Sequence, residues 1–549
     1  MKIAVGLLVL VALLVGGVLA LPFLVDLNRY QDQYKPLIEE ALNRKVQLQD
    51  IRLTVWPRIG ARMAGFSVLD DSAFSSGPFA SLSSLDVGVK LMPLLSGKVE
   101  VEEITLHGPV ITVIKNKNGV LNVSTIGRKG VPVPEKPSRA PIPSTEGPLK
   151  LLALLAVDRV SIAGGKLTYR DLSAATPTEY VVQDLELLLR DVRLGQTPQL
   201  HVASLVQPFN LPVKLDGTFG PLKEAIDIDK IDFKLAVGKT DFTITGNAAG
   251  NDAMVTISSP VINTANLPMS LPLKKPVDIK DLKIIAEVKG QEAKFNSLSL
   301  RLFDGEVKGQ GKMIAGAEGP PFKGSVALQG LQLGPALNAV AETPVTISGT
   351  AGADLSLQGK GFSMPDLTKA LEGTGHVAVR DGKIEGVNIL QEVADALKVA
   401  GISLGEAKAT AFSTIESDLA IKQGVINVQR LLVDSHDFQA TGGGTVGFDQ
   451  KLNLIVNLNL SPDVSQKISA ASPVVKIAMK DGRLSLPLTI TGTAQAPSYG
   501  VDVKGLTGKV QEQVKKKVEE AVGGLLKGTT KPEDLKKEGQ ELLKGLFGR

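Results

Sequence analysis

Cysteine is absent from the chain of 549 residues, which excludes disulfide bonds and thiolate metal sites. Aromatic residues make up only 4%, and neither charge dominates, since 61 basic residues stand against 57 acidic ones for a net charge of +4. Basic and acidic residues are mixed along the chain, so no nucleic-acid-binding stripe is indicated. Glycine is frequent, with 56 residues. This composition favours many short elements separated by turns over long helices.

Long hydrophobic runs are also absent, with one exception at the N-terminus. No charged residue occurs from Ile3 through Leu14 to Val25. As a helix this run would be about 35 Å long, enough to cross a hydrocarbon core of about 30 Å. The alternative is a cleaved signal peptide with Val18-Leu19-Ala20 as its cleavage site. Because the apolar run continues beyond that site, we favour an uncleaved anchor, with most of the chain outside the cytoplasm.

Composition changes along the chain predict its organisation. After the anchor (1–25), a short helix from Pro36 to Arg44, with Pro36 in its first turn, precedes a series of strands that ends near residue 126. Residues 127–150 hold six prolines and predict a semi-rigid linker. A middle β region (151–360) and a second β region with short helical patches (361–504) follow. The tail (505–549) predicts amphipathic helices that pack on the sheet or contact a membrane surface or partner protein.

Alternation of apolar and polar residues after position 98 predicts two strands joined at a Gly108-Pro109 turn. The alternation slips at Glu102-Glu103, where a β-bulge would restore the phase. The apolar positions on the first strand are Val99, Val101, Ile104 and Leu106.

A second stretch, "KLNLIVNLNL", alternates without interruption and gives one uniformly aliphatic face. Such a face must be covered by another sheet, a helix or an apolar ligand. Its apolar positions are Leu452, Leu454, Val456, Leu458 and Leu460.

Two short motifs resemble catalytic or nucleotide-binding sites, but their surroundings do not support either function. "GISLG" matches G-x-S-x-G with Ser403 as nucleophile, yet a helical pattern precedes it where the hydrolase elbow needs a strand. "GGGTVG" (442–447) matches G-x-G-x-x-G, yet a strand pattern follows it where a dinucleotide site needs a helix. The four histidines are scattered singly, without the spacing of metal ligands. We therefore expect no enzyme activity, catalytic residue, metal or cofactor.

Several longer stretches resemble the AsmA family of bacterial envelope proteins. Near the N-terminus these are the Pro-Leu-Leu-x-Gly step (93–97) and the Asn-Gly-x-x-Asn ending (118–122). Near the C-terminus they are "GTGHVAVRDGKIEGVNIL", "IESDLAIKQGVINVQRLLVDSHDFQATGGGTVGFDQKLNL" and "LPLTITGTAQAPSYGVDV". The stretch "NRKVQLQ" departs from the family by lacking a Thr-Gly-Arg-like turn. Residues 26–126 and 361–504 therefore resemble AsmA-like β domains, and the middle carries only the β pattern.

The resemblance implies a mainly β protein on a single-pass anchor in the inner membrane. Its periplasmic body would be an elongated, curved, mostly antiparallel β-sheet with an apolar groove and C-terminal helices. Proteins of this plan are linked to phospholipid traffic and outer-membrane assembly. The nine apolar positions of the two stretches above would then line the groove. The alternative is a structural or assembly factor for outer-membrane proteins, whose apolar sheet is filled by its own helices.

Overall fold

In a computed structural model, the described residues form two compact units. The structure describes residues 26–56, 58–126, 157–173, 177–223, 227–268, 271, 273–314, 319–340, 346–361, 363–396, 408–471, 479–501 and 515. Unit 1 extends to residue 262 and includes 266–269 and 287–290, and unit 2 holds the rest. The predicted anchor residues Ile3, Leu14 and Val25 lie outside the described residues, as do the linker and all but one residue of the tail.

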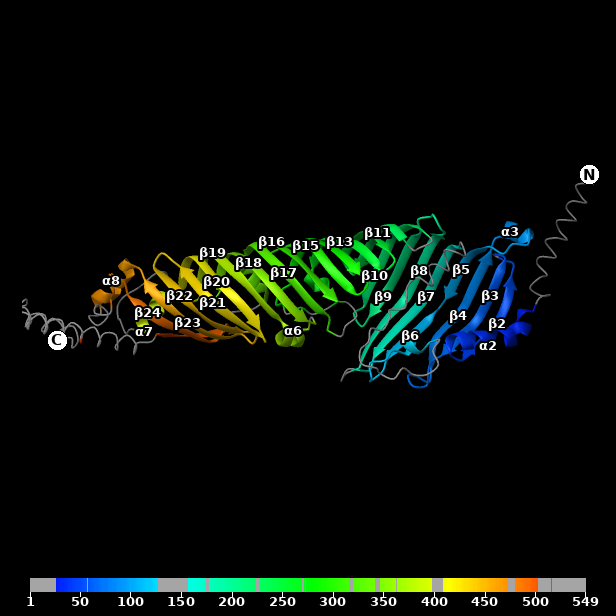
Figure 1. Cartoon of the computed structure of the whole chain (residues 1–549), viewed down its shortest axis with the longest axis horizontal. Coiled ribbons are helices and arrows are strands. Elements are labelled where there is room, and N and C mark those ends of the chain that lie inside the picture. The colour runs from blue at the N-terminus through cyan, green and yellow to red at the C-terminus, as the bar shows by residue number, and fades with distance from the viewer. Residues whose placement is uncertain are drawn as a thin grey trace, which may run out of the picture. The chain divides into compact units, whose positions relative to one another are not determined.

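Unit 1 is a sheet whose strands follow one another in chain order (Figure 1). Its helical segments are η1 (Leu27–Tyr30), α2 (Gln31–Leu42), α3 (Leu91–Leu95) and η2 (Asn122–Thr125). Its strands are β1 (Val46–Gln47), β2 (Asp50–Thr54), β3 (Gly60–Leu69), β4 (Pro78–Val89), β5 (Val101–His107), β6 (Val110–Lys115), β7 (Val157–Asp171), β8 (Thr178–Val192), β9 (Gln199–Gln207), β10 (Leu211–Leu222), β11 (Asp227–Val237), β12 (Thr240–Ala249) and β13 (Asp252–Asn263).

Unit 2 repeats this plan with antiparallel neighbours throughout its described pairings from β15 onward. The segment η3 (Thr264–Asn266) and strand β14 (Asp278–Lys289) contribute residues to both units. The helices of unit 2 are α5 (Leu333–Val340), α6 (Met364–Ala370), α7 (Ile389–Ala396) and α8 (Pro462–Ala471). Its remaining strands are β15 (Glu292–Leu302), β16 (Gly305–Ile314), β17 (Pro321–Gln332), β18 (Thr346–Lys360), β19 (Glu372–Glu385), β20 (Ala409–Lys422), β21 (Val425–Asp434), β22 (Phe438–Gly447), β23 (Lys451–Leu460), β24 (Ser485–Thr493) and β25 (Ala496–Val501).

The mainly β expectation is confirmed, since the described part of the chain holds 25 strands and only short helices. The sheet is mixed, because β7 runs parallel to β5 and β6. None of the helices among the described residues is long and apolar enough to span a bilayer.

The predicted turn at Gly108-Pro109 is not a hairpin. Strands β5 and β6 both pair with β4 on one side and with β7 on the other, so they are two pieces of one strand path. Gly108 has a φ of 55° and its N–H donates to the Ala163 carbonyl, 2.8 Å away. Since Pro109 has no N–H to donate, the ladder is interrupted here without reversing direction.

The predicted helix near Pro36 exists but begins earlier than expected. Helix α2 follows directly on η1, so Pro36 lies inside it and not in its first turn. The helix ends at Asn43, which adopts a left-handed conformation (φ 52°). Its N–H bonds back to the carbonyls of Glu39 and Glu40, a common way of ending a helix.

The predicted bulge is present at Glu102. Gly88 of β4 lies opposite Glu103, but the next residue, Val89, lies opposite Val101. Glu102 is therefore an extra residue in β5. It keeps Val101 on the same face as Ile104 and Leu106 despite the odd spacing in the sequence.

Deleting Glu102 tests this register. The deletion should be tolerated, because the shortened strand would alternate regularly and keep Val101 on its present face. Deleting Thr105 should instead turn Ile104 toward the opposite face, bring Glu103 onto the apolar side and disrupt packing in unit 1. Circular dichroism and protease resistance of the full chain compare the two. Equal damage from both deletions would contradict the assigned bulge.

Candidate functional site: a sheet with two unlike faces

The ladder of unit 1 brings apolar side chains from ten strands into one row. Residues directly opposite each other in neighbouring strands lie on the same face of a sheet. All members of the row are half-buried. The row consists of Ile51, Met63, Leu85, Leu106, Ile162, Leu187, Val202, Leu215, Leu235 and Phe242, in β2 to β5 and β7 to β12.

Unit 2 carries a similar row across eleven strands. Its members are Leu298, Gly309, Val326, Leu355, Gly375, Leu419, Val428, Gly444, Leu454, Ile490 and Tyr499, in β15 to β25. Its large side chains are half-buried like those of unit 1. The glycines have a packing role, because a Cβ on Gly375 would lie 2.4 Å from Cδ2 of Leu355. We call these two rows, with their same-side neighbours, the apolar faces of the units.

The opposite faces are largely polar. In unit 1 the row adjacent to the apolar one includes Arg62 of β3, Asp86 of β4, Thr105 of β5 and Ser161 of β7. Arg62 donates two hydrogen bonds to the Asp86 carboxylate, at 2.6 and 2.7 Å. These bonds lower the pKa of Asp86 and raise that of Arg62. This face meets water and its charges pair with one another.

Part of the apolar face in unit 2 is covered by helices. Val456 and Leu458 of β23, with Leu460 at its end, are 3%, 1% and 0% exposed. Leu458 and Leu460 belong to a core cluster that includes Leu390 and Val393 of α7 and Val464 and Ile468 of α8. Further along the same strand, Leu454 and Leu452 are only half-buried. Of the five positions predicted in this strand, three therefore lie in a closed core and two on its accessible continuation.

The four positions predicted in unit 1 also lie in different environments. Leu106 belongs to the apolar row, and Val101 and Ile104 pack against a core cluster that includes Val160, Leu189 and Phe219. Val99 precedes β5, is 72% exposed and belongs to no strand. The alternation predicted it because the strand pattern extends two residues beyond the actual start of the ladder.

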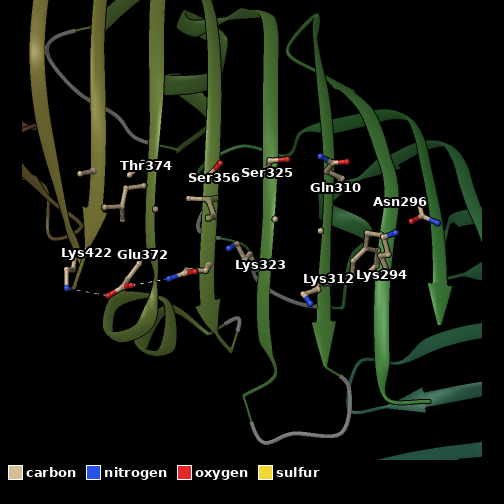
Figure 2. A pocket seen from close by; sticks show the side chains of 18 of the residues that line it. Lys294, Asn296, Gln310, Lys312, Lys323, Ser325, Ser356, Glu372, Thr374 and Lys422 are labelled. Atoms are coloured by element: carbon tan, nitrogen blue, oxygen red, sulfur yellow. Dashed lines mark hydrogen bonds and ion pairs between the residues drawn. The ribbon is translucent and has the colours of Figure 1, made fainter. Parts of the chain in front are cut away.

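A pocket of about 1090 Å³, lined by polar side chains together with Phe295, Leu357 and Ile421, lies across β15 to β21 of unit 2 (Figure 2). Its labelled side chains, among them Gln310, Ser325, Ser356 and Thr374, belong to the face opposite the apolar row. Glu372 accepts a hydrogen bond from Gln358 at 3.2 Å and pairs with Lys422 at 3.6 Å. No sequence motif indicated this pocket, although its polar residues are the polar members of the alternation that predicted the strands.

The described residues contain no group of three or more histidines and carboxylates that could hold a metal ion. His107, His201 and His376 each contact one carboxylate, at 3.1, 2.5 and 3.0 Å. Ser403 lies outside the described residues. The glycines of "GGGTVG" end β22, and β23 follows, so the predicted strand after this motif is confirmed.

Because part of β23 lies in the core and part on the accessible face, truncating two of its leucines should reduce the stability of unit 2 by different amounts. Leu458→Ala should destabilise unit 2 by about 2–5 kcal/mol, the range for a buried leucine. Leu452→Ala should cost much less, because its side chain is already partly in water. Urea unfolding of the full chain, followed by circular dichroism, measures both. Equal losses would contradict the division.

The Arg62–Asp86 pair predicts a pH dependence. Because the folded state lowers the pKa of Asp86, its stabilisation is complete above the ordinary value of about 3.9 and is lost as the pH falls through the lower folded value. For an exposed pair, Asp86→Asn should cost at most about 1 kcal/mol at neutral pH and nothing in strong acid. Arg62→Gln and the double variant should show the same loss. Additive losses would contradict the pairing.

Comparison with known proteins identifies the family of the chain. No curated protein and no solved structure matches the chain. The model of the AsmA family matches residues 1–267 and 272–431, which is more than half of the chain. This match includes the middle region, where the sequence motifs quoted above do not occur. The chain belongs to the AsmA family.

Proposed function

We propose that this protein binds phospholipids by their acyl chains along the accessible apolar faces and conducts them from the inner membrane toward the outer membrane. The observation that carries this proposal is the pair of rows. In unit 1, half-buried apolar side chains follow one another across ten strands. In unit 2, half-buried apolar side chains, separated in places by glycines, extend across eleven strands, and in both units the opposite face is largely polar.

The extent of the two rows across many strands suits the movement of a lipid along them. Burying acyl carbons contributes about 0.8 kcal/mol per CH₂, so an aliphatic row is an adequate binding surface without any specific polar contact. Neighbouring strands lie about 4.8 Å apart. An acyl chain that moves across the sheet therefore contacts the side chains of the next strand before it loses contact with those of the previous strand. A lipid can therefore slide along the row without returning to water, and no catalytic residue is required.

The surroundings of the protein are part of this proposal. The uncharged run from Ile3 to Val25 is long enough to anchor the chain in the inner membrane, with its bulk in the periplasm. The amphipathic pattern of residues 505–549 suits contact with a membrane surface or with an outer-membrane or envelope protein. AsmA-family membership supports an envelope role of this kind.

A second function, as a structural or assembly factor for outer-membrane proteins, is favoured by one observation. Helices α7 and α8 cover the apolar face around Leu458 and Leu460. If the remaining apolar face were also covered in the cell by protein segments, the sheet would be a scaffold with a filled core. The two functions differ in what contacts the accessible leucines.

Photocrosslinking at neighbouring residues on opposite faces distinguishes them. Benzoylphenylalanine in place of Leu355 or Leu454 should form adducts with phospholipid in living cells, because these side chains lie on the accessible apolar face. The same probe in place of Ser356 or Asn453 lies on the polar face and should form few. Mass spectrometry of the purified full chain detects the adducts.

Phospholipid adducts confined to the leucine positions would support lipid conduction. Adducts of the leucine positions with protein alone would overturn it and favour the assembly factor. Equal phospholipid labelling at all four positions would show a general exposure to membrane, which also contradicts a lipid-binding face.

A further inference from the structure

We propose that one end of unit 1 docks directly on the surface of a phospholipid bilayer, through exposed apolar side chains that lie outside the core clusters of the described residues. We call this group the tip. It consists of Trp56, Leu91, Met92, Leu95 and Val99.

Strand topology places the members of the tip together. Trp56 lies in the connection from β2 to β3, while α3 and Val99 lie in the connection from β4 to β5. Strand β3 pairs with both β2 and β4, so the two connections are at the same end of neighbouring strands (Figure 1). The Val89 N–H donates to the Ile59 carbonyl at 2.9 Å, which joins the bases of the two connections.

The exposure of the tip is unusual for a folded protein. Trp56 is 84% exposed, Met92 76%, Val99 72%, Leu95 71% and Leu91 47%. Scattered single apolar residues need no explanation, but a contiguous group of this size marks an interaction site. None of these five side chains contributes to the core clusters of the described residues.

The chemistry of the tip suits a lipid interface. Tryptophan is enriched where membrane meets water, because its ring is apolar and its N–H is polar. Lys98 is exposed beside Val99 and complements anionic headgroups. The leucine, methionine and valine side chains of the tip are apolar and suit contact with the acyl chains beneath the headgroups.

The position of the tip along the chain favours a bilayer over another occupant. The uncharged run ends at Val25, directly before the first described residue. The Asn28 side chain then bonds to Asp50 at 2.7 Å and to the Ile51 N–H at 2.9 Å, at the start of β2. Because five extended residues span at most about 17 Å, Trp56 lies within that distance of Ile51. This step rests on the membrane anchor proposed above.

The tip also adjoins the apolar face of unit 1. Val87 and Val89 of β4 lead along that face to α3, and the bulge at Glu102 keeps Val101 beside Val89. A lipid that leaves the bilayer at the tip would meet aliphatic side chains at once. The docking itself does not require that lipid be conducted.

Trp56 is the only tryptophan in the sequence, so tryptophan fluorescence reports the tip alone. The full chain is reconstituted into vesicles of phosphatidylethanolamine and phosphatidylglycerol, with or without bromine on the acyl chains. Bromine should quench the emission of Trp56 by roughly half, because interfacial residues enter about 5–10 Å into the headgroup and acyl boundary. Leu95→Asp should abolish most of this quenching, and Ser96→Asp, at an exposed neighbouring residue, should preserve it.

A matched control moves the tryptophan to the other end of the same unit. Strand β7 runs parallel to β5, away from the tip, so the connection from β9 to β10 lies at the far end of the strands. Phe209 in this connection is 45% exposed. The double variant Trp56→Phe, Phe209→Trp should show little quenching, and circular dichroism confirms that each variant folds.

The outcomes separate the docking from the anchor and from the lipid-conducting function. Flotation of the vesicles shows whether the chain is anchored. A floating protein whose Trp56 is not quenched keeps the anchor and overturns the tip, whereas one that neither floats nor is quenched overturns both. Equal quenching of the Phe209→Trp control, or protection of Trp56 by a second copy of the chain in detergent, would also overturn the proposal. Adduct formation at Leu355 is measured independently of all these results.

Discussion

The period of two in a β-strand is the constraint on which the rest of this structure depends. Each residue belongs to one face, and a slip of one position would exchange an aliphatic face for a charged one. Local features of the backbone keep each strand in the correct phase. The extra residue Glu102 restores the phase of β5, and Gly108 with Pro109 interrupts the strand path without reversing it. Glycines such as Gly375 let a neighbouring leucine lie flat on the sheet.

The same constraint explains how a single surface can serve both stability and function. Where α7 and α8 cover it, the apolar face is a core, and Leu458 and Leu460 are almost completely buried. Where no such packing occurs, Leu355 and Leu454 remain half-buried and accessible. The chemistry of the two regions is identical, so covering by other segments alone separates a structural leucine from a candidate lipid contact. On the polar face, pairs such as Arg62 with Asp86 satisfy charges locally.

A function without reactive groups is consistent with this arrangement. The described histidines that contact carboxylates do so one at a time, and no metal-binding group occurs among the described residues. The proposed work depends on the order of ordinary side chains along the sheet and, at the tip, on their exposure. Both are properties of many strands together.

The alternation of apolar and polar residues by itself determined the β class of this protein, the apolar side of β5 and β23, and the position of the bulge. It could do so because a period of two residues is a local property of the chain. The family resemblance was likewise readable from the sequence. Only the tertiary structure decided that β5 and β6 share one path, that Val99 lies outside the sheet, and that α8 follows β23. Helix α8 was missed because its ten residues, beginning at Pro462, interrupt a series of strands. Burial of Leu458 and Leu460 but not of Leu454 depends on packing with α7, which lies earlier in the chain, and with α8, and no pattern within the strand records that contact.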